Sequence, residues 1–213
     1  MRQLVRRGVL TLGIALAVAA VVPSYIRAYT ISGESDAPAY VTGDRVIVNL
    51  AAYTLRIPYS DRVFKISADP RRGDMVLFRG QDGQLAIKRV VATSGMRVAM
   101  QRNHLVVNER PLRYRPVEDQ ERGRISRGSL GTSLELEQGN GPELYISYSP
   151  GLGPYDSFGT VEVPADMFFL MGSNRDMSAD SRSHGLVHRS RILGKVVGRG
   201  WAAGKPSTER EGS

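Results

Sequence analysis

Ser35-Asp36-Ala37-Pro38 and, shortly after it, Gly43-Asp44-Arg45-Val46-Ile47-Val48-Asn49 form the stretch from which the fold can be read. A Gly-Asp turn followed by alternating β-branched residues predicts a strand over 45–49. Ser35 stands before that strand, in a run of turn-forming residues. Serine in such a run is usually a turn or cap residue, so by itself it indicates no chemistry.

The sequence beyond this stretch continues in short β-branched runs that are bounded by Gly, Asp and Asn turns. Such runs predict a predominantly β domain. The expected strands cover residues 45–49, 74–78, 85–91, 97–100 and 104–108, and strand patterning returns at 159–163, 168–171 and 192–201.

Two segments differ from this pattern. Residues 112–161 are rich in Arg, Glu, Gly and Pro, which predicts a smaller β and loop insertion on the rim of the core. Residues 206–213 form a polar tail that is expected to be disordered. Residues 28–205, between the N-terminal segment and this tail, are therefore expected to form the main domain.

The N-terminal segment, residues 1–27, has the composition of a membrane anchor. Three arginines precede an apolar run, and no charged residue occurs from Gly8 through Ile26. This run is close to the roughly 20 residues that a spanning helix needs, and the preceding arginines favour a cytoplasmic N-terminus. A cleavable secretory signal remains an alternative, because Ala17-Val18-Ala19 resembles a cleavage site. Either interpretation places the domain outside the cytoplasm.

Composition limits the other function classes. The 213 residues include no cysteine, so neither a disulfide framework nor a thiolate metal site is possible. The net charge of +8 is spread between apolar strands instead of being gathered on one helix, so we expect no nucleic-acid partner. Proximity to an anionic membrane explains the same charge. Histidines and carboxylates lack metal-ligand spacing, and we expect neither a metal nor another cofactor.

Lys88 is a candidate general base. A lysine amine can take a proton from a serine hydroxyl only when it is neutral, which burial among apolar neighbours favours. On a strand, Lys88 shares one face with Ala86 and Val90. A surface lysine would fit the same pattern, so the residue alone does not decide.

Three motifs in order resemble the bacterial type I signal peptidase family of membrane-bound Ser/Lys proteases. The motifs are Ser35-Asp36-Ala37-Pro38 with Gly43-Asp44, then Lys88-Arg89-Val90, then Gly172-Ser173-Asn174-Arg175-Asp176-Met177-Ser178-Ala179-Asp180-Ser181-Arg182. The resemblance implies an antiparallel β catalytic core.

The resemblance also implies roles for individual residues. It makes Ser35 the nucleophile and Lys88 the base, with Ser178 orienting the lysine amine through a hydrogen bond. An ion pair between Asp180 and Arg182 would fix the loop that carries Ser178. Asp36 and Pro38 would border the pocket that receives the substrate.

This sequence departs from the family pattern at several positions. Asp36 replaces a methionine beside the nucleophile, Ser173 an aspartate and Met177 an asparagine. Gly33 stands where some members have a serine whose hydroxyl helps to bind the oxyanion. The oxyanion hole would then rely on the backbone N–H of Ser35, with Ser32 or water as a further donor.

Two rival interpretations remain open. A histidine base is one, although none of His104, His184 and His188 lies in a motif that pairs it with Ser35. The other is a specialised or catalytically weak homologue that acts on dedicated clients or serves as a membrane-anchored binding factor. Asp36 favours it, because a carboxylate beside Lys88 would hold the amine protonated.

The sequence therefore predicts a single-pass protease of the cell membrane with an extracytoplasmic catalytic domain. Its expected partners are membrane lipid and exported preproteins, from which it would remove the signal peptides.

Overall fold

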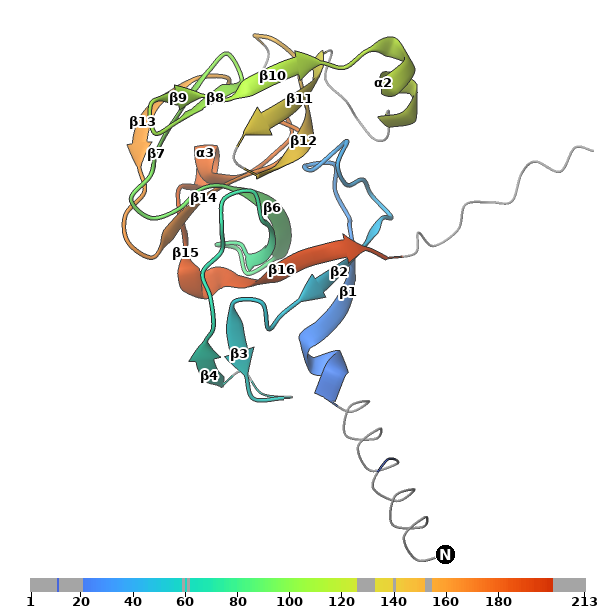
Figure 1. Cartoon of the computed structure of the whole chain (residues 1–213), viewed down its shortest axis with the longest axis vertical. Coiled ribbons are helices and arrows are strands. Elements are labelled where there is room, and N and C mark those ends of the chain that lie inside the picture. The colour runs from blue at the N-terminus through green and yellow to red at the C-terminus, as the bar shows by residue number, and fades with distance from the viewer. Residues whose placement is uncertain are drawn as a thin grey trace, which may run out of the picture.

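The described part of the chain is built almost entirely of antiparallel strands (Figure 1). The computed structural model describes residues 11, 21–58, 60, 62–125, 133–139, 141–151 and 155–200. The predicted mainly β fold is thus confirmed. The strands are β1 (Ile26–Thr30), β2 (Arg45–Asn49), β3 (Thr54–Arg56), β4 (Val63–Ile66), β5 (Met75–Arg79), β6 (Leu85–Ala92), β7 (Arg97–Gln101), β8 (His104–Val107), β9 (Arg110–Pro111), β10 (Arg113–Pro116), β11 (Ser133–Gly139), β12 (Gly141–Tyr148), β13 (Phe158–Glu162), β14 (Met167–Met171), β15 (Val187–His188) and β16 (Ile192–Arg199).

A seven-stranded sheet forms the centre of the described structure, with the strand order β1-β2-β16-β5-β6-β14-β15. The opening stretch of the sequence supplies β2, which pairs with β16 from the far end of the chain. Strand β6 lies between β5 and β14, and Lys88 is the register partner of Val76 on β5. The sheet therefore holds Lys88 in one of its interior strands.

Both faces of β6 are covered, which explains the unusual burial of Lys88. Ile87 packs in one apolar cluster, Val90 in a second and Val91 in a third. A strand that is buried on both faces shields each of its side chains from water. The exposed fraction of Lys88 is only 2%.

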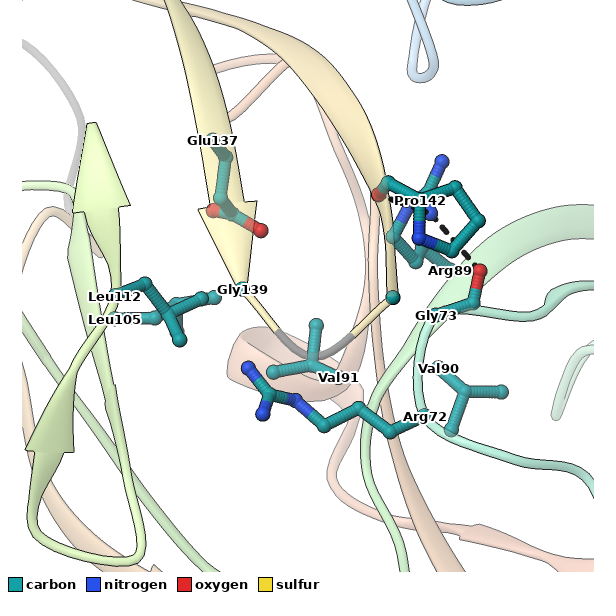
Figure 2. Close-up of a pocket in the computed structure, with 11 residues that line it drawn as sticks. Arg72, Gly73, Arg89, Val90, Val91, Leu105, Leu112, Glu137, Gly139 and Pro142 are labelled. Carbon is teal, nitrogen blue, oxygen red and sulfur yellow. Dashed lines mark hydrogen bonds between the residues drawn. The ribbon is translucent and has the colours of Figure 1, made fainter. Parts of the chain in front are cut away.

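The region of the predicted insertion contains a separate three-stranded sheet, β10-β11-β12, and the short helix α2 (Asp119–Ile125). A four-stranded sheet, β13-β7-β8-β9, lies beside it in Figure 1. A cavity of about 30 Å³ lies between the insertion and the core, and Figure 2 shows the residues that line it. Arg89 spans this junction, because its Nη1 donates to the carbonyl oxygens of Gly73 at 2.9 Å and Pro142 at 3.5 Å. The residue next to Lys88 thus connects two sheets.

The predicted terminal segments are mostly outside the described residues. Of the expected anchor, residues 1–10 and 12–20 are not described, nor are residues 201–213, which include the predicted tail. The search for a membrane-crossing helix in the described residues found none of sufficient length and apolarity. Residues 21–25 are helical and lead directly into β1.

Candidate active site

Ser35 and Lys88 meet although 52 residues separate them in the sequence. Ser35 lies in the turn region between β1 and β2, and Lys88 lies on β6. The Nζ atom of Lys88 is 2.6 Å from the Oγ atom of Ser35. A hydroxyl and an amine at this distance can exchange a proton directly.

The amine of Lys88 has two further oxygen partners. It donates to the Oδ2 atom of Asp36 at 3.2 Å and to the carbonyl oxygen of Ile87 at 3.0 Å. An ammonium group has three protons to donate, and this site offers three oxygen atoms. Three oxygen atoms therefore surround Nζ, one for each proton of an ammonium group.

Asp36 is a buried carboxylate with few stabilising contacts. Its exposed fraction is 4%, and besides Lys88 its partners are the backbone N–H of Ser173, at 3.3 Å from Oδ1, and the hydroxyl of Ser35, at 3.5 Å from Oδ2. Burial raises the pKa of Asp36, and the opposing attraction of Lys88 does not cancel that effect. Keeping this carboxylate ionised thus costs free energy.

The third motif forms a loop that closes over the serine. The backbone N–H of Asn174 donates to the carbonyl oxygen of Ser35 at 3.1 Å. A Cβ atom at Gly172 would lie 2.3 Å from that same carbonyl oxygen and equally close to the Oγ atom of Ser178. Because no side chain fits in that space, the loop needs glycine at 172.

Asp180 and Arg182 form the ion pair implied by the family resemblance. The Nε and Nη2 atoms of Arg182 each lie 2.9 Å from a carboxylate oxygen of Asp180, and the backbone N–H of Gly172 donates to Asp180 at 3.0 Å. Both side chains are buried. Burial acts to raise the pKa of Asp180, but the bonds from Arg182 and Gly172 outweigh it and the pKa is lowered.

The predicted hydrogen bond from Ser178 to the lysine amine is wrong for this structure. The Oγ atom of Ser178 is buried, and it is not among the hydrogen-bond partners of Lys88 Nζ. Lys88 is held by Ser35, Asp36 and the Ile87 carbonyl instead. The physical reason is the substitution beside the nucleophile, because Asp36 supplies an acceptor where the family pattern has an uncharged methionine.

Arg175, to which the motifs assign no role, fixes the same loop from the other side. Its Nη2 atom lies 2.5 Å from Glu137 on β11, and both side chains are buried. Its backbone N–H donates to Ser147 on β12 at 2.8 Å. The loop is thereby bound to the insertion. The position of Arg175 inside the third motif could have indicated a role for it, whereas its partner Glu137 belongs to no motif.

A cleft of about 410 Å³ opens beside Ser35 and Lys88. Its apolar lining includes the small side chains of Ala86 and Ala179 and the larger one of Leu170. Neither Asp36 nor Pro38 lines it, and both are buried. The expectation that these two residues border the substrate pocket stays a prediction, and the carboxylate of Asp36 is engaged with Lys88.

The histidines make other contacts. His184 lines the cleft, and its Nδ1 atom lies 3.1 Å from the hydroxyl of Ser183. The Nδ1 atom of His188 bonds to Ser190, at the start of the short 3-10 helix η1 (Arg189–Arg191), and His104 pairs with Glu135 in the insertion at 2.8 Å. The only amine or imidazole bonded to Ser35 among the described residues is that of Lys88.

A serine hydroxyl bonded to a buried lysine at the edge of a cleft is the arrangement of a serine peptidase that uses an amine as its base. The chain matches the model of the family described as signal peptidase, peptidase S26, over residues 1–201. It belongs to that family, and it is a serine peptidase that cleaves signal peptides. The family implies exported preproteins as its substrates.

Named relatives agree with the family. Signal peptidase IB of Staphylococcus aureus strain COL is 25% identical over 204 residues, which are 94% of this chain and 92% of the relative. Signal peptidase I of Leptolyngbya laminosa is 26% identical over 204 residues, covering 91% of this chain and 78% of the relative. A solved signal peptidase I of Enterococcus faecalis V583 is 23% identical, with a TM-score of 0.37, and the match covers 61% of this chain and 97% of that one.

Proposed function

We propose that Ser35 is the nucleophile and Lys88 the general base in the cleavage of signal peptides. The observation that carries this assignment is the 2.6 Å contact between Ser35 Oγ and Lys88 Nζ. The neutral amine takes the hydroxyl proton while Oγ attacks the scissile carbonyl carbon. The resulting ammonium then protonates the departing amine, and water, activated by the same amine, hydrolyses the acyl-enzyme.

The amine must lose a proton before this sequence can begin. Its three oxygen partners, one of them the Asp36 carboxylate, can each accept one proton of the ammonium group. Activity should therefore rise with pH as the amine becomes neutral. A fluorophosphonate directed at histidine-assisted serines should label Ser35 weakly.

One backbone group and two small side chains support the remaining chemistry. The N–H of Ser35 is the proposed oxyanion donor, since position 33 carries no hydroxyl. The small side chains Ala86 and Ala179 in the cleft fit substrate residues with small side chains. This supports precursors with small residues before the cleaved bond.

The membrane arrangement is also a proposal. The charge-free run from Gly8 to Ile26, preceded by three arginines, supports residues 1–27 as a cytoplasmic N-terminus and single transmembrane anchor in the cell membrane. Residues 28–205 would then form the extracytoplasmic peptidase domain, with the insertion at 112–161. Substrate signal peptides would reach the cleft from the bilayer.

A binding factor without proteolytic activity is not favoured. Such a protein has no need to keep a buried lysine amine on a serine hydroxyl, and burying the amine costs free energy. Asp36 suggested that alternative, but its carboxylate contacts the Lys88 amine without displacing that amine from Ser35. The geometry thus supports catalysis that is limited by protonation.

The decisive experiment is cleavage of an exported precursor with an Ala-x-Ala sequence before the cleavage site. The purified full chain should release the signal peptide, and Ser35→Ala and Lys88→Ala should not, although both variants should keep the circular dichroism spectrum and melting temperature of the parent. Retained cleavage by Lys88→Ala would exclude the Ser/Lys mechanism. Strong fluorophosphonate labelling together with a rate plateau below pH 6 would also contradict it.

A further inference from the structure

A cleft of about 800 Å³ opens where the insertion meets the four-stranded sheet. Arg72, Arg110 and Arg113 line this opening, the arginine cleft, and none of its described lining residues is acidic. The three guanidinium groups have no hydrogen bond or ion pair with any other residue in the described part of the chain. Because a cleft lined by charges of one sign concentrates ions of the opposite sign, the arginine cleft attracts anions.

Two acidic residues adjoin this lining in the sequence, and both are engaged elsewhere. Glu137 accepts a hydrogen bond from the Nη2 atom of Arg175 at 2.5 Å, and both of these side chains are buried. Glu109, which precedes Arg110, pairs with Arg97 at 2.6 Å. Neither carboxylate therefore forms an ion pair with an arginine of the cleft.

Arg72 is the most enclosed of the three arginines. It is half-buried, and it also lines the small cavity of Figure 2, where its guanidinium lies beside Gly139. Burial lowers the pKa of Arg72, and the attraction of Glu137 does not cancel that effect. A Cβ atom at residue 139 would lie 3.2 Å from Arg72 Nη2 and 3.1 Å from Leu112 Cδ2, so glycine there leaves room for the guanidinium. A bound anion would stabilise this enclosed charge.

The lining also distinguishes between classes of anion. Guanidinium groups bind both carboxylates and phosphates, but three of them in one cleft match the charge of about −1.5 to −2 that a phosphomonoester carries at pH 7. No described lining residue is aromatic, so the bases of a nucleic acid would find no ring to stack on. Strands β8, β9 and β10 lie away from residues 21–25 in Figure 1, which argues against a lipid headgroup.

We propose that the arginine cleft binds a phosphate group, either as free inorganic phosphate or as the phosphomonoester of a larger molecule. Arg72 would hold the phosphate from the enclosed side, and the exposed Arg110 and Arg113 would contact it from the rim. Met96 and Leu112 line the same cleft and offer an apolar surface to an organic part of the ligand. The arginine cleft shares no lining residue with the cleft that contains Ser35, so this site does not depend on the proposed function.

Isothermal titration calorimetry of the purified full chain tests the site with inorganic phosphate and with glycerol 1-phosphate, at an ionic strength held constant with sodium chloride. At least one of the two should bind saturably. Arg72→Gln should weaken that binding by at least about tenfold, the loss expected for a hydrogen bond to a charged group. Arg45→Gln removes an exposed arginine on β2 and should leave binding unchanged. No saturable binding of either ligand, or equal weakening in the two variants, would overturn the proposal.

Gly139→Val separates the shape of the site from its charge. It keeps every arginine but places side-chain atoms where Arg72 Nη2 lies, so it should weaken phosphate binding as Arg72→Gln does. Unchanged binding in both variants, each with the parental melting temperature, would remove Arg72 from the site and overturn the proposal. Displacement of the bound ligand by acetate at the same ionic strength would overturn the choice of phosphate. Tighter binding of glycerol 1-phosphate than of inorganic phosphate would identify the ligand as a phosphate-bearing organic molecule, and the reverse order would identify it as the free anion.

Discussion

Asp36 and Asp180 are both buried and both paired with a cation, yet their carboxyl groups behave in opposite ways. Asp180 receives two bonds from the Arg182 guanidinium and one from the backbone N–H of Gly172, and its pKa is lowered. Asp36 receives one bond at 3.2 Å from Lys88 and a longer one from a backbone N–H, and its pKa is raised.

The difference shows that burial alone does not decide the charge of a carboxylate. The number and quality of its hydrogen bonds decide it, because each bond to the anion offsets part of the lost hydration. Asp180 has enough bonds to stay ionised and acts as a fixed part of the loop. Asp36 has fewer bonds, so its ionisation costs more free energy and its pairing with Lys88 is more easily altered by pH, by substitution or by substrate. We infer that one pair holds the site together while the other sets its protonation.

The largest expected effect comes from replacing Lys88, the cation that pairs with Asp36. Lys88→Ala should reduce precursor cleavage by at least about 10²-fold to 10⁴-fold, the range that a positioned general base contributes. Lys88→His should fail in the same way, because an imidazole is too short to reach Ser35 from β6. Initial rates of signal peptide release provide the measurement.

His184→Ala and His188→Ala are the matched controls for the lysine variants. Neither ring is bonded to Ser35, and each bonds to a neighbouring serine instead. Both variants should therefore keep most of the parental activity. A loss of activity in His184→Ala as large as that in Lys88→Ala would show that the general base has been assigned to the wrong residue.

The second-largest expected effect concerns the ion pair between Asp180 and Arg182. Asp180→Asn should lower the free energy of unfolding by about 3–5 kcal/mol, because it leaves the buried Arg182 charge without its partner. Urea denaturation followed by circular dichroism would measure it. Asp69→Asn is the control, since Asp69 pairs with Arg189 from a position that is 76% exposed, and such a pair is worth about 0–1 kcal/mol. Equal losses in the two variants would show that burial does not distinguish these pairs.

The pH dependence of stability should separate the two carboxylates by sign. The pKa of Asp180 is lowered, so its contribution is complete above the ordinary value of 3.8 and is lost as pH falls below that value. The pKa of Asp36 is raised, so its ionisation destabilises the fold as pH rises above 3.8. Unfolding free energies measured from pH 2 to pH 7 should therefore lose part of their acid-side fall in Asp180→Asn. In Asp36→Asn the decrease in unfolding free energy that Asp36 ionisation causes above pH 3.8 should disappear. Parallel curves for the two variants would refute the difference between the two carboxyl groups.

Much of this arrangement could be predicted from the sequence because it depends on local patterns. The alternation of residues 45–49 gives β2 its observed bounds, and the strand around Lys88 differs by one residue from its prediction. The meeting of Ser35 and Lys88 could be predicted only through the family resemblance, because no local pattern encodes a contact across 52 residues. The surroundings of the Ser178 hydroxyl and the Arg175–Glu137 pair could not be predicted, since each depends on how a loop packs against other strands.

The smallest expected effect comes from Asp36 itself. Asp36→Met restores the uncharged side chain of the family pattern and removes the carboxylate 3.2 Å from Lys88 Nζ, so the ammonium form loses its counter-charge. A loss of about 1.4 kcal/mol of that stabilisation would make a tenfold difference in the fraction of neutral amine. Cleavage of an Ala-x-Ala precursor at pH 7 should therefore rise several-fold, up to about tenfold, and half-maximal activity should move to lower pH.

Asp36→Asn distinguishes charge from shape in this prediction. It keeps the size and the hydrogen-bonding capacity of the side chain, so it should shift the pH profile in the same direction as Asp36→Met if the negative charge is what restrains Lys88. A shift in Asp36→Met alone would instead mean that packing beside Ser35 controls the rate. An unchanged profile in both variants would refute the restraint, and slower cleavage of the physiological preproteins with faster cleavage of the Ala-x-Ala precursor would make Asp36 a specificity determinant for dedicated clients. Because Ser35 remains the nucleophile in every one of these outcomes, Ser35→Ala in the Asp36→Met background should still be inactive.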